Sequence, residues 1–244
     1  MLLAIDIGNS RIKAAVFEQN ILLEKFIFLK NELVEEINNI LNSFVEINNV
    51  IISSVGAIEE KDFSFLTKIV NVTFVNHQFR FPFENNYSTP NTLGIDRMVL
   101  AAGASLLYPD YYKLIIDAGT CVTYDYLDDK NIYHGGAISP GIKLRYESLH
   151  NYTAKLPLLE KKIPENQIGN STKESIHSGV INGLINEIDG FISDYVCSNA
   201  KFIIILTGGD ADFLAKQLKN TIFANSNFLL ESLNLLYQYN QKND

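Results

Sequence analysis

Residues 3–10 read Leu-Ala-Ile-Asp-Ile-Gly-Asn-Ser, and residues 115–120 read Ile-Ile-Asp-Ala-Gly-Thr. In both segments an apolar run ends at an Asp-x-Gly turn that is followed by a polar side chain. Alternating apolar residues come after each turn, which is typical of a second strand that runs back beside the first. Each segment therefore predicts a β-hairpin, and we refer to residues 6–13 as hairpin 1 and to residues 117–120 as hairpin 2.

The pattern around the two hairpins also repeats. After hairpin 1 the apolar spacing predicts a third strand and a helix over Glu32–Val45, and after hairpin 2 it predicts a third strand and a helix over Pro140–Tyr152. Such a repeat indicates an internal duplication of about half the chain. We expect an α/β fold with two lobes, residues 1–111 and 112–244, each built on a mixed sheet, with the two Asp-x-Gly turns facing each other across a central cleft.

The segments between the repeats give less regular signals. Helical spacing predicts a short helix over Lys61–Val70 and a long one over Thr172–Ser198. The prolines in Asn76–Leu93 predict an irregular stretch, followed by a helix from about Asp96 to Leu107.

The composition is that of a globular protein with an excess of acid. Of 244 residues, 47% are hydrophobic, and 20 Lys and Arg against 28 Asp and Glu give a net charge of −8. This balance argues against nucleic acid as a partner, because binding its backbone needs a clustered basic face. The sequence contains no apolar run of about 18 residues, so we expect no membrane span. Its first residues lack a basic leader, so we expect no signal peptide. Two cysteines, Cys121 and Cys197, are too few for a disulfide framework, and we expect a cytoplasmic protein with no membrane partner.

An Asp-x-Gly hairpin has the chemistry of a phosphate-binding loop. Glycine lets the backbone approach an anion, and the turn amides with the following polar side chain donate hydrogen bonds to it. The carboxylate can hold a hydrated Mg²⁺ that bridges phosphates, and Lys13 adds a positive charge on the second strand. A single such hairpin is better explained as a tight turn, but two at the starts of duplicated halves favour a nucleotide clamp. The sequence contains neither a Walker loop nor a Rossmann glycine motif after a strand.

Two further motifs lie where a loop or strand enters a helix. In Gly94-Ile95-Asp96-Arg97, a carboxylate that can take a hydroxyl proton stands beside a guanidinium that can hold a carboxylate, which suits a small acid with an alcohol group. Asp96 alone would be explained as a helix N-cap. Thr207-Gly208-Gly209-Asp210 predicts either a turn against which a base or ribose lies or a plain strand-to-helix turn capped by Asp210.

In order and spacing, these motifs resemble the type III pantothenate kinases. That family belongs to the acetate and sugar kinase/Hsp70/actin superfamily, whose fold is a duplicated ribonuclease H-like (actin-like ATPase) fold. The resemblance rests on the following segments: residues 6–13, 90–97, 117–120, 135–141, 153–157, 168–172 and 207–209. The sequence departs from the common pattern at Ser10, where Thr is usual, at Cys121, where Ala is usual, and at Ser171.

The resemblance implies ATP-dependent phosphorylation of pantothenate to 4'-phosphopantothenate, the first step of coenzyme A synthesis. It implies Asp96 as the general base, Asp117 as the ligand of a monovalent cation (K⁺ or NH₄⁺), and a homodimer. The chemistry of hairpin 1 makes Asp6 the expected Mg²⁺ ligand. The residues it assigns to ATP are Asp6, Ile7, Gly8, Asn9, Ser10, Arg11, Ile12, Lys13 and Thr120. Those it assigns to pantothenate are Tyr87, Gly94, Ile95, Asp96, Arg97 and Thr172.

Three other functions stay open at this point. A sugar-type kinase of the same superfamily would use the same hairpins, although a neutral polyol offers Arg97 no charged partner. A nucleotide-binding regulatory protein without turnover would keep ATP binding but not phosphoryl transfer. A nuclease using Asp6 and Asp117 would need a basic groove, which the charge balance does not support.

Overall fold

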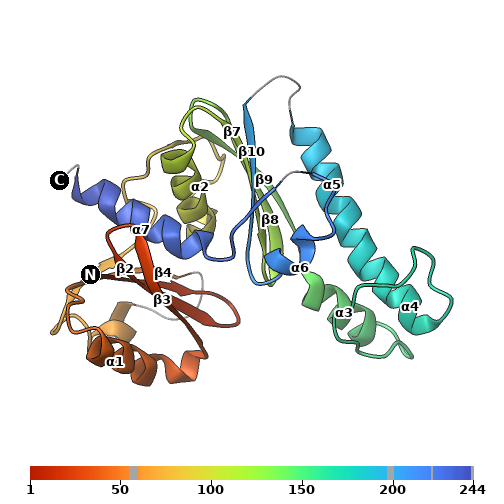
Figure 1. The fold of residues 1–244 in the computed structure, drawn as a ribbon, viewed down its shortest axis with the longest axis horizontal. Coiled ribbons are helices and arrows are strands. Elements are labelled where there is room, and N and C mark those ends of the chain that lie inside the picture. Colours follow the sequence, from red (N-terminus) through yellow and green to blue (C-terminus); the bar gives the residue numbers. More distant parts are fainter. Residues whose placement is uncertain (55–59, 197–200, 221, 243–244) are drawn as a thin grey trace. The chain divides into compact units, whose positions relative to one another are not determined.

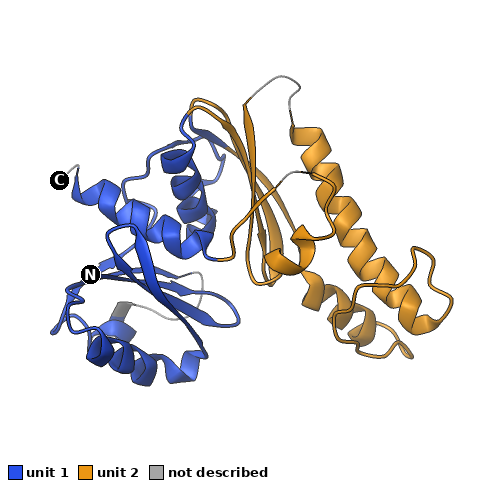
Figure 2. Cartoon of the chain, in the orientation of Figure 1, with its two compact units in different colours: residues 1–109, 131–133, 227–244 blue, residues 110–130, 134–226 orange. Residues whose placement is uncertain are grey.

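The computed structural model describes residues 1–54, 60–196, 201–220 and 222–242 (Figure 1). Contacts between Cα atoms divide the chain into two compact units (Figure 2). Unit 1 is Met1–Pro109, Asn131–Tyr133 and Asn227–Asp244, and unit 2 is Asp110–Lys130 and His134–Ser226. The predicted C-terminal lobe of residues 112–244 differs from unit 2, because the C-terminal helix groups with unit 1. Cys197 and the end of the helix predicted over Thr172–Ser198 lie outside the described residues.

Unit 1 is built on a mixed sheet in which the first strand lies in the middle. The strand order is β3-β2-β1-β4-β5. β1 pairs antiparallel with β2 and parallel with β4, so that hairpin 1 and the end of β4 lie at the same edge of the sheet. The strands are β1 (Leu2–Ile7), β2 (Ile12–Glu18), β3 (Ile21–Phe28), β4 (Asn49–Ser54) and β5 (Asn71–Phe74).

Helices cover both faces of the unit 1 sheet. On one face, α1 (Leu33–Ser43) packs on Leu3, Ile5 and Ile7 of β1. On the other face, α2 (Ile95–Leu107) and α7 (Phe228–Gln241) pack together and on β1 and β4. Side chains alternate along a strand, so Asp6 points to the face that carries α2 and α7.

Unit 2 repeats this topology. Its strands lie in the order β9-β8-β7-β10-β11, with β7 antiparallel to β8 and parallel to β10. A sixth, two-residue strand, β6 (Glu84–Asn85), pairs with β9 at the edge of this sheet. In both units the chain order of the strands across the sheet is thus third, second, first, fourth, fifth, which confirms the predicted duplicated ribonuclease H-like fold. The strands are β7 (Tyr112–Ala118), β8 (Cys121–Leu127), β9 (Ile132–Pro140), β10 (Phe202–Thr207) and β11 (Phe223–Ala224).

The helices of unit 2 cover one face of its sheet. Their apolar side chains pack on Leu114, Ile116, Tyr124 and Leu206 from three neighbouring strands. The helical segments are α3 (Ile142–Asn151), α4 (Thr172–His177), a π-helical segment (Ser178–Asn182), α5 (Gly183–Tyr195) and α6 (Ala211–Ala215).

Two segments differ from the sequence predictions. The helix predicted over Lys61–Val70 is wrong: a 3-10 turn covers Glu60–Phe63, and further turns follow. There the Thr67 hydroxyl donates to the Ser64 carbonyl, and side-chain bonds of this kind compete with a helix. The stretch predicted to be irregular contains a short strand, β6 (Glu84–Asn85), which pairs with the first two residues of β9.

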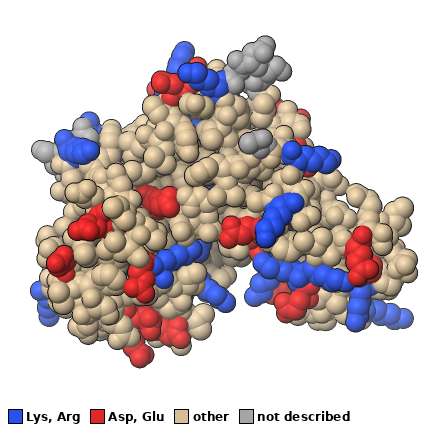
Figure 3. All heavy atoms as spheres, viewed as in Figure 1, with Lys and Arg blue, Asp and Glu red and all other residues tan. Residues whose placement is uncertain are grey.

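Surface charge is mixed in both units. On the face drawn in Figure 3, Lys and Arg side chains lie among Asp and Glu side chains. Among the helices that the structure describes, none has both the length and the apolar character needed to cross a membrane.

Lys113 is a fully buried lysine at the beginning of β7. Its Nζ donates to the Asp128 carbonyl at 3.1 Å. Burial lowers the pKa of Lys113 to about 8, although Asp128, Asp129 and Asp110 oppose this shift. Below pH 8 the lysine is protonated in both the folded and the unfolded chain, so the folded state bears the full cost of the buried charge.

This cost should disappear as the pH rises through the interval between about 8 and the ordinary lysine value of 10.5. We therefore expect Lys113→Met to raise the free energy of unfolding at pH 7, by up to about 3 kcal/mol. The advantage over the parent protein should shrink as the pH is raised to 10. Chemical denaturation of both proteins at several pH values measures this difference, and a constant difference would contradict a lowered lysine pKa.

Candidate active site

Hairpin 1 presents polar groups at the edge of the unit 1 sheet. Gly8 N–H donates to the Arg11 carbonyl at 3.2 Å and closes the turn. The side chains of Asn9, Ser10 and Arg11 are exposed around it, and Lys13 is half-buried opposite Asp6 in the β1–β2 register. The side chains of Ile7 and Ile12 are fully buried, so only their backbone atoms can contact a ligand.

Asp6 is a buried carboxylate with a fixed orientation. It is 5% exposed, and the Ser53 hydroxyl donates to Asp6 Oδ1 at 3.0 Å. Ser53 is itself fully buried and lies opposite Asp6 in the parallel β1–β4 register. Ser53 was not among the predicted site residues. The signal for it was its position at the end of a buried apolar strand, where polar residues begin.

If hairpin 1 binds MgATP, as the sequence predicts, then Ser53→Ala should raise KM for MgATP by roughly tenfold, because a hydrogen bond to a charged group contributes about 1.5–3 kcal/mol. The Asp6 carboxylate would lose its fixed orientation, whereas Asp96 and Arg97 would be unaffected. Steady-state kinetics with each substrate varied in turn measures the effect, and a matching rise in KM for the second substrate would contradict it. Ser43→Ala, on the exposed surface of α1, is the matched control.

Hairpin 2 is held by backbone contacts at the corresponding edge of the unit 2 sheet. Gly119 N–H donates to the Cys121 carbonyl at 2.9 Å, and Gly141 N–H donates to the Thr120 carbonyl at 3.0 Å. Thr120 is exposed and Asp117 is half-buried. Backbone hydrogen bonds therefore fix the hairpin, while the groups that would face a ligand lie at the surface.

Gly208 packs directly against Asp117. Its φ is +99°, a conformation that favours glycine, and a Cβ there would collide with Asp117 Oδ1 and the Ala118 carbonyl. Asp210 N–H donates to that carbonyl at 3.0 Å. The Asp210 side chain forms an ion pair with Lys161 and does not cap α6, so the predicted capping role is wrong.

Asp96 and Arg97 lie in the first turn of α2. Gly94 occupies the N-cap position, so Asp96 is not the cap, and its Oδ1 accepts a hydrogen bond from Arg97 N–H at 2.9 Å. A Cβ at Gly94 would collide with the Asp96 carboxylate. Burial raises the pKa of Asp96 above its ordinary value, and the hydrogen bond and charge of Arg97 oppose this shift. Asp96 is thus a stronger base than an aspartate in water.

Arg97 is buried beneath an aromatic ring. It is 5% exposed, and its guanidinium carbon lies 5.9 Å from the centre of the Tyr87 ring. Tyr87 contacts Tyr133, with 6.2 Å between ring centres. His77 Nε2 lies 2.8 Å from the carbonyl oxygen of Leu93, the residue before Gly94, and no sequence motif predicted this contact. Unit 1 therefore brings the Tyr87 ring to the guanidinium of Arg97, which is next to Asp96 in the first turn of α2.

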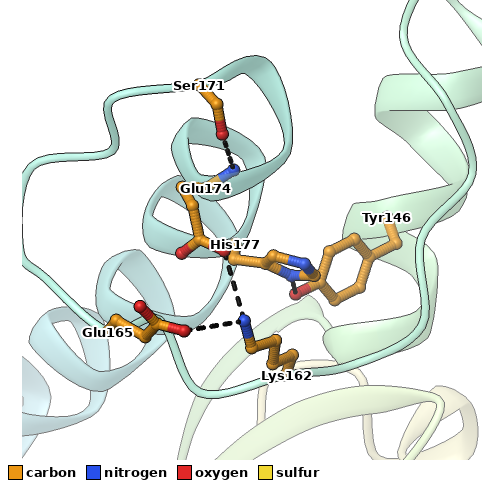
Figure 4. Close-up of polar contacts among 6 residues, drawn as sticks. All are labelled: Tyr146, Lys162, Glu165, Ser171, Glu174 and His177. Atoms are coloured by element: carbon orange, nitrogen blue, oxygen red, sulfur yellow. Dashed lines mark hydrogen bonds and ion pairs between the residues drawn. The ribbon is translucent and has the colours of Figure 1, made fainter.

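Thr172 belongs to unit 2 and is not grouped with these residues. It is the exposed first residue of α4, and the Ser171 hydroxyl accepts a hydrogen bond from Glu174 N–H at 3.3 Å (Figure 4). Lys162 from the preceding loop donates to Glu174 at 3.3 Å. These contacts fix the start of α4, where Thr172 is presented.

Residues 2–194 match the model of the type III pantothenate kinase family. The chain belongs to this family. A type III pantothenate kinase from Flavobacterium johnsoniae is 59% identical over 244 residues, which cover 100% of both chains.

The family assignment agrees with likenesses to solved structures, which show the fold alone. A protein from Campylobacter jejuni, described as a conserved putative Baf family transcriptional activator, has a TM-score of 0.66 at 20% identity over 98% of this chain and 99% of that one. A putative 2-dehydro-3-deoxygalactonokinase from Sinorhizobium meliloti has a TM-score of 0.57 at 12% identity, over 98% of this chain and 99% of that one. These neighbours share the duplicated fold with the pantothenate kinase family.

Proposed function

We infer that the protein transfers the γ-phosphoryl group of ATP to the primary hydroxyl of pantothenate, the first step of coenzyme A synthesis. The observation that carries this inference is the match to the type III pantothenate kinase family, and the neighbouring Asp96 and Arg97, with the Arg97 guanidinium against the Tyr87 ring, support it. A cytoplasmic location follows as part of the proposal, because ATP is supplied there.

We assign the phosphates of ATP to the two hairpins. In hairpin 1 the exposed side chains of Asn9, Ser10 and Arg11, the half-buried turn glycine Gly8 and the charge of Lys13 support this role, and in hairpin 2 the exposed Thr120 supports it. Asp6, Ile7 and Ile12 complete the set through a carboxylate and through backbone atoms. Backbone hydrogen bonds close the turn at Gly8 and hold the Thr120 carbonyl, and such pre-formed turns lower the entropy that binding costs.

Cations complete the phosphate site in this proposal. Asp6 fits a Mg²⁺ ligand because one of its oxygens is held by Ser53 and it lies at the turn. In the described part of the chain no three His, Cys, Asp or Glu side chains gather to hold a metal, so a divalent ion would take its other ligands from phosphates and water. When bound, it would neutralise charge on the transferred group. Asp117, fixed against Gly208, suits a monovalent cation, K⁺ or NH₄⁺.

The substrate residues have separate tasks. Asp96 orients the attacking hydroxyl of pantothenate and takes its proton as the new bond to phosphorus forms. Arg97 holds the carboxylate of pantothenate, with Tyr87 over its guanidinium, and the Gly94–Ile95 backbone lets the substrate approach. Thr172 provides a further hydroxyl from unit 2.

A homodimer is part of the proposal and rests on exposed apolar side chains of unit 2. Tyr152 is 89% exposed and Ile168 is 84% exposed, with Leu158 and Ile163 in the same connection between α3 and α4. A second copy of the chain would cover them. Size-exclusion chromatography with light scattering measures the mass, and Ile168→Asp should shift the protein toward the monomer if this surface is the interface.

One coupled assay tests the main proposal. ADP release is measured with MgATP and pantothenate in buffers that contain K⁺, NH₄⁺ or Na⁺ as the only monovalent cation. We expect turnover that requires pantothenate and that is supported by K⁺ or NH₄⁺ but not by Na⁺. Product formation from a hexose instead of pantothenate would overturn the substrate assignment. ATP binding without ADP release under any of the cations would favour a regulatory protein.

A further inference from the structure

Arg145 on α3 joins several elements of unit 2. Its Nε donates to the Pro140 carbonyl at 2.8 Å, and its Nη2 donates to Ser139 Oγ at 2.9 Å and to Glu187 Oε2 at 2.5 Å. The side chain is 18% exposed. One guanidinium thus fastens the end of β9 to both α3 and α5.

Glu187 on α5 anchors this guanidinium. Its other oxygen accepts a hydrogen bond from the Tyr124 hydroxyl at 2.9 Å. Tyr124 is fully buried, and its ring stacks on Phe191 with 4.1 Å between centres. The Tyr124 hydroxyl therefore has one position, and through Glu187 it fixes the position of Arg145.

The end of β9 that Arg145 holds supports hairpin 2 directly. Gly141 follows Pro140, and its N–H is the donor to the Thr120 carbonyl at 3.0 Å. A Cβ at Gly141 would collide with the carbonyls of Gly119 and Thr120, so the two backbones are in close contact. A movement of the Ser139–Gly141 corner is transmitted to hairpin 2 because no space separates them.

We propose that Arg145, held by Glu187 and Tyr124, is a positioning residue for ATP binding: it fixes the Ser139–Gly141 corner, and the corner fixes hairpin 2 at Thr120. The inference rests on the assignment of Thr120 to ATP. Arg145 acts through the backbone and does not contact ATP. Without Arg145 the hairpin must become ordered when ATP binds, and the entropy cost of this ordering weakens the affinity for ATP.

The first test is Arg145→Met, which keeps the aliphatic stem of the side chain and removes its hydrogen bonds. We expect the Kd for MgATP, measured by calorimetry, and KM for MgATP to rise by about tenfold, while KM for pantothenate stays within about twofold. A purely structural role would lower the fraction of active enzyme without moving one KM selectively. The matched control is Lys143→Met, which removes the same charge from the same helix at a side chain that is 83% exposed.

A second test asks whether Arg145 and Glu187 act as one unit. Glu187→Gln should also raise the Kd for MgATP. The double variant should have a Kd no higher than that of Arg145→Met alone. If Arg145→Met does not fold, Arg145→Lys and Tyr124→Phe replace it, each with an expected rise in Kd of about threefold, because each leaves part of the network intact.

Three results would overturn the proposal: an unchanged Kd for MgATP in these variants, an equal rise in both KM values, or the same effect from Lys143→Met. Calorimetry does not depend on turnover. A protein that binds MgATP but does not phosphorylate pantothenate would refute the proposed function and still leave the role of Arg145 open to the same measurement of Kd.

Discussion

Asp96→Asn should lower kcat by about 1,000-fold, because general base catalysis contributes roughly 10²- to 10⁴-fold. The attacking hydroxyl of pantothenate must lose its proton as it bonds to phosphorus, and the amide of asparagine cannot accept that proton. Water would then have to accept it, in a site where no other side chain has been assigned that task.

The substitution should leave the local structure intact. Asparagine keeps an oxygen at the Oδ1 position, which accepts a hydrogen bond from Arg97 N–H. It has almost the same volume and fits under Gly94, where the space is restricted. KM for both substrates should therefore stay within about threefold of the parent values, which is the pattern of a group that acts in the transition state.

The pH profile provides an independent check. Because burial raises the pKa of Asp96, kcat/KM for pantothenate in the parent protein should fall with decreasing pH at a value above the ordinary range of aspartate. Asp96→Asn should remove this limb of the profile. Asp212→Asn, in the first turn of α6 and exposed, is the matched control and should change neither kcat nor the profile. A variant at Asp96 with near-normal turnover would mean that the assigned base is wrong.

The fold was predictable from the sequence where local pattern and tertiary structure agree. The two Asp-x-Gly hairpins have buried apolar runs and a turn glycine, and both formed as expected. Lys61–Val70 has apolar residues at helical spacing, yet Phe63, Leu66 and Val70 are buried from a series of turns instead. Periodicity detects which side chains are buried but does not distinguish a helix from successive turns over so short a segment.

The contacts of the candidate site were predictable only for residues that lie in motifs. Asp96 and Arg97 are neighbours in sequence, so their pairing could be seen directly. Ser53 reaches Asp6 across 47 positions and Glu187 reaches Arg145 across 42. Such contacts depend on strand register and helix packing, which a single sequence does not specify. The supporting residues were therefore found only in the structure.

Equivalent positions in the two duplicated sheets show how the two hairpins differ. Asp6 and Asp117 occupy the same position in their sheets, and each faces a hydroxyl residue on the parallel neighbour, Ser53 and Thr207. On the antiparallel neighbour, Asp6 faces Lys13, whereas Asp117 faces Thr123. The first hairpin thus has a cationic side chain beside its carboxylate and the second does not. This difference agrees with proposed roles in which hairpin 1 binds phosphates with the help of Lys13 and Asp117 binds a monovalent cation.

Arg97→Met should raise KM for pantothenate by about 100-fold, because loss of one partner of a buried charge pair costs roughly 2–5 kcal/mol. The guanidinium is buried under Tyr87, so its attraction for a carboxylate is little screened by water. KM for MgATP should change by no more than about threefold. Loss of the Arg97 charge also removes an interaction that lowers the pKa of Asp96, so kcat should be compared at a pH high enough to keep Asp96 ionised in both proteins.

A neutral substrate analogue separates charge recognition from packing. The alcohol analogue of pantothenate, in which a hydroxymethyl group replaces the carboxylate, offers Arg97 no negative charge. The parent protein should prefer pantothenate strongly in kcat/KM, and Arg97→Met should reduce this preference by about 100-fold. Arg97→Lys keeps the charge without the forked geometry, so its preference for pantothenate should lie between those of the parent protein and Arg97→Met. If Arg97→Met lowers kcat/KM equally for pantothenate and for the alcohol analogue, then Arg97 supports the structure of the pocket and does not bind the carboxylate. Another residue must then bind the carboxylate of the substrate.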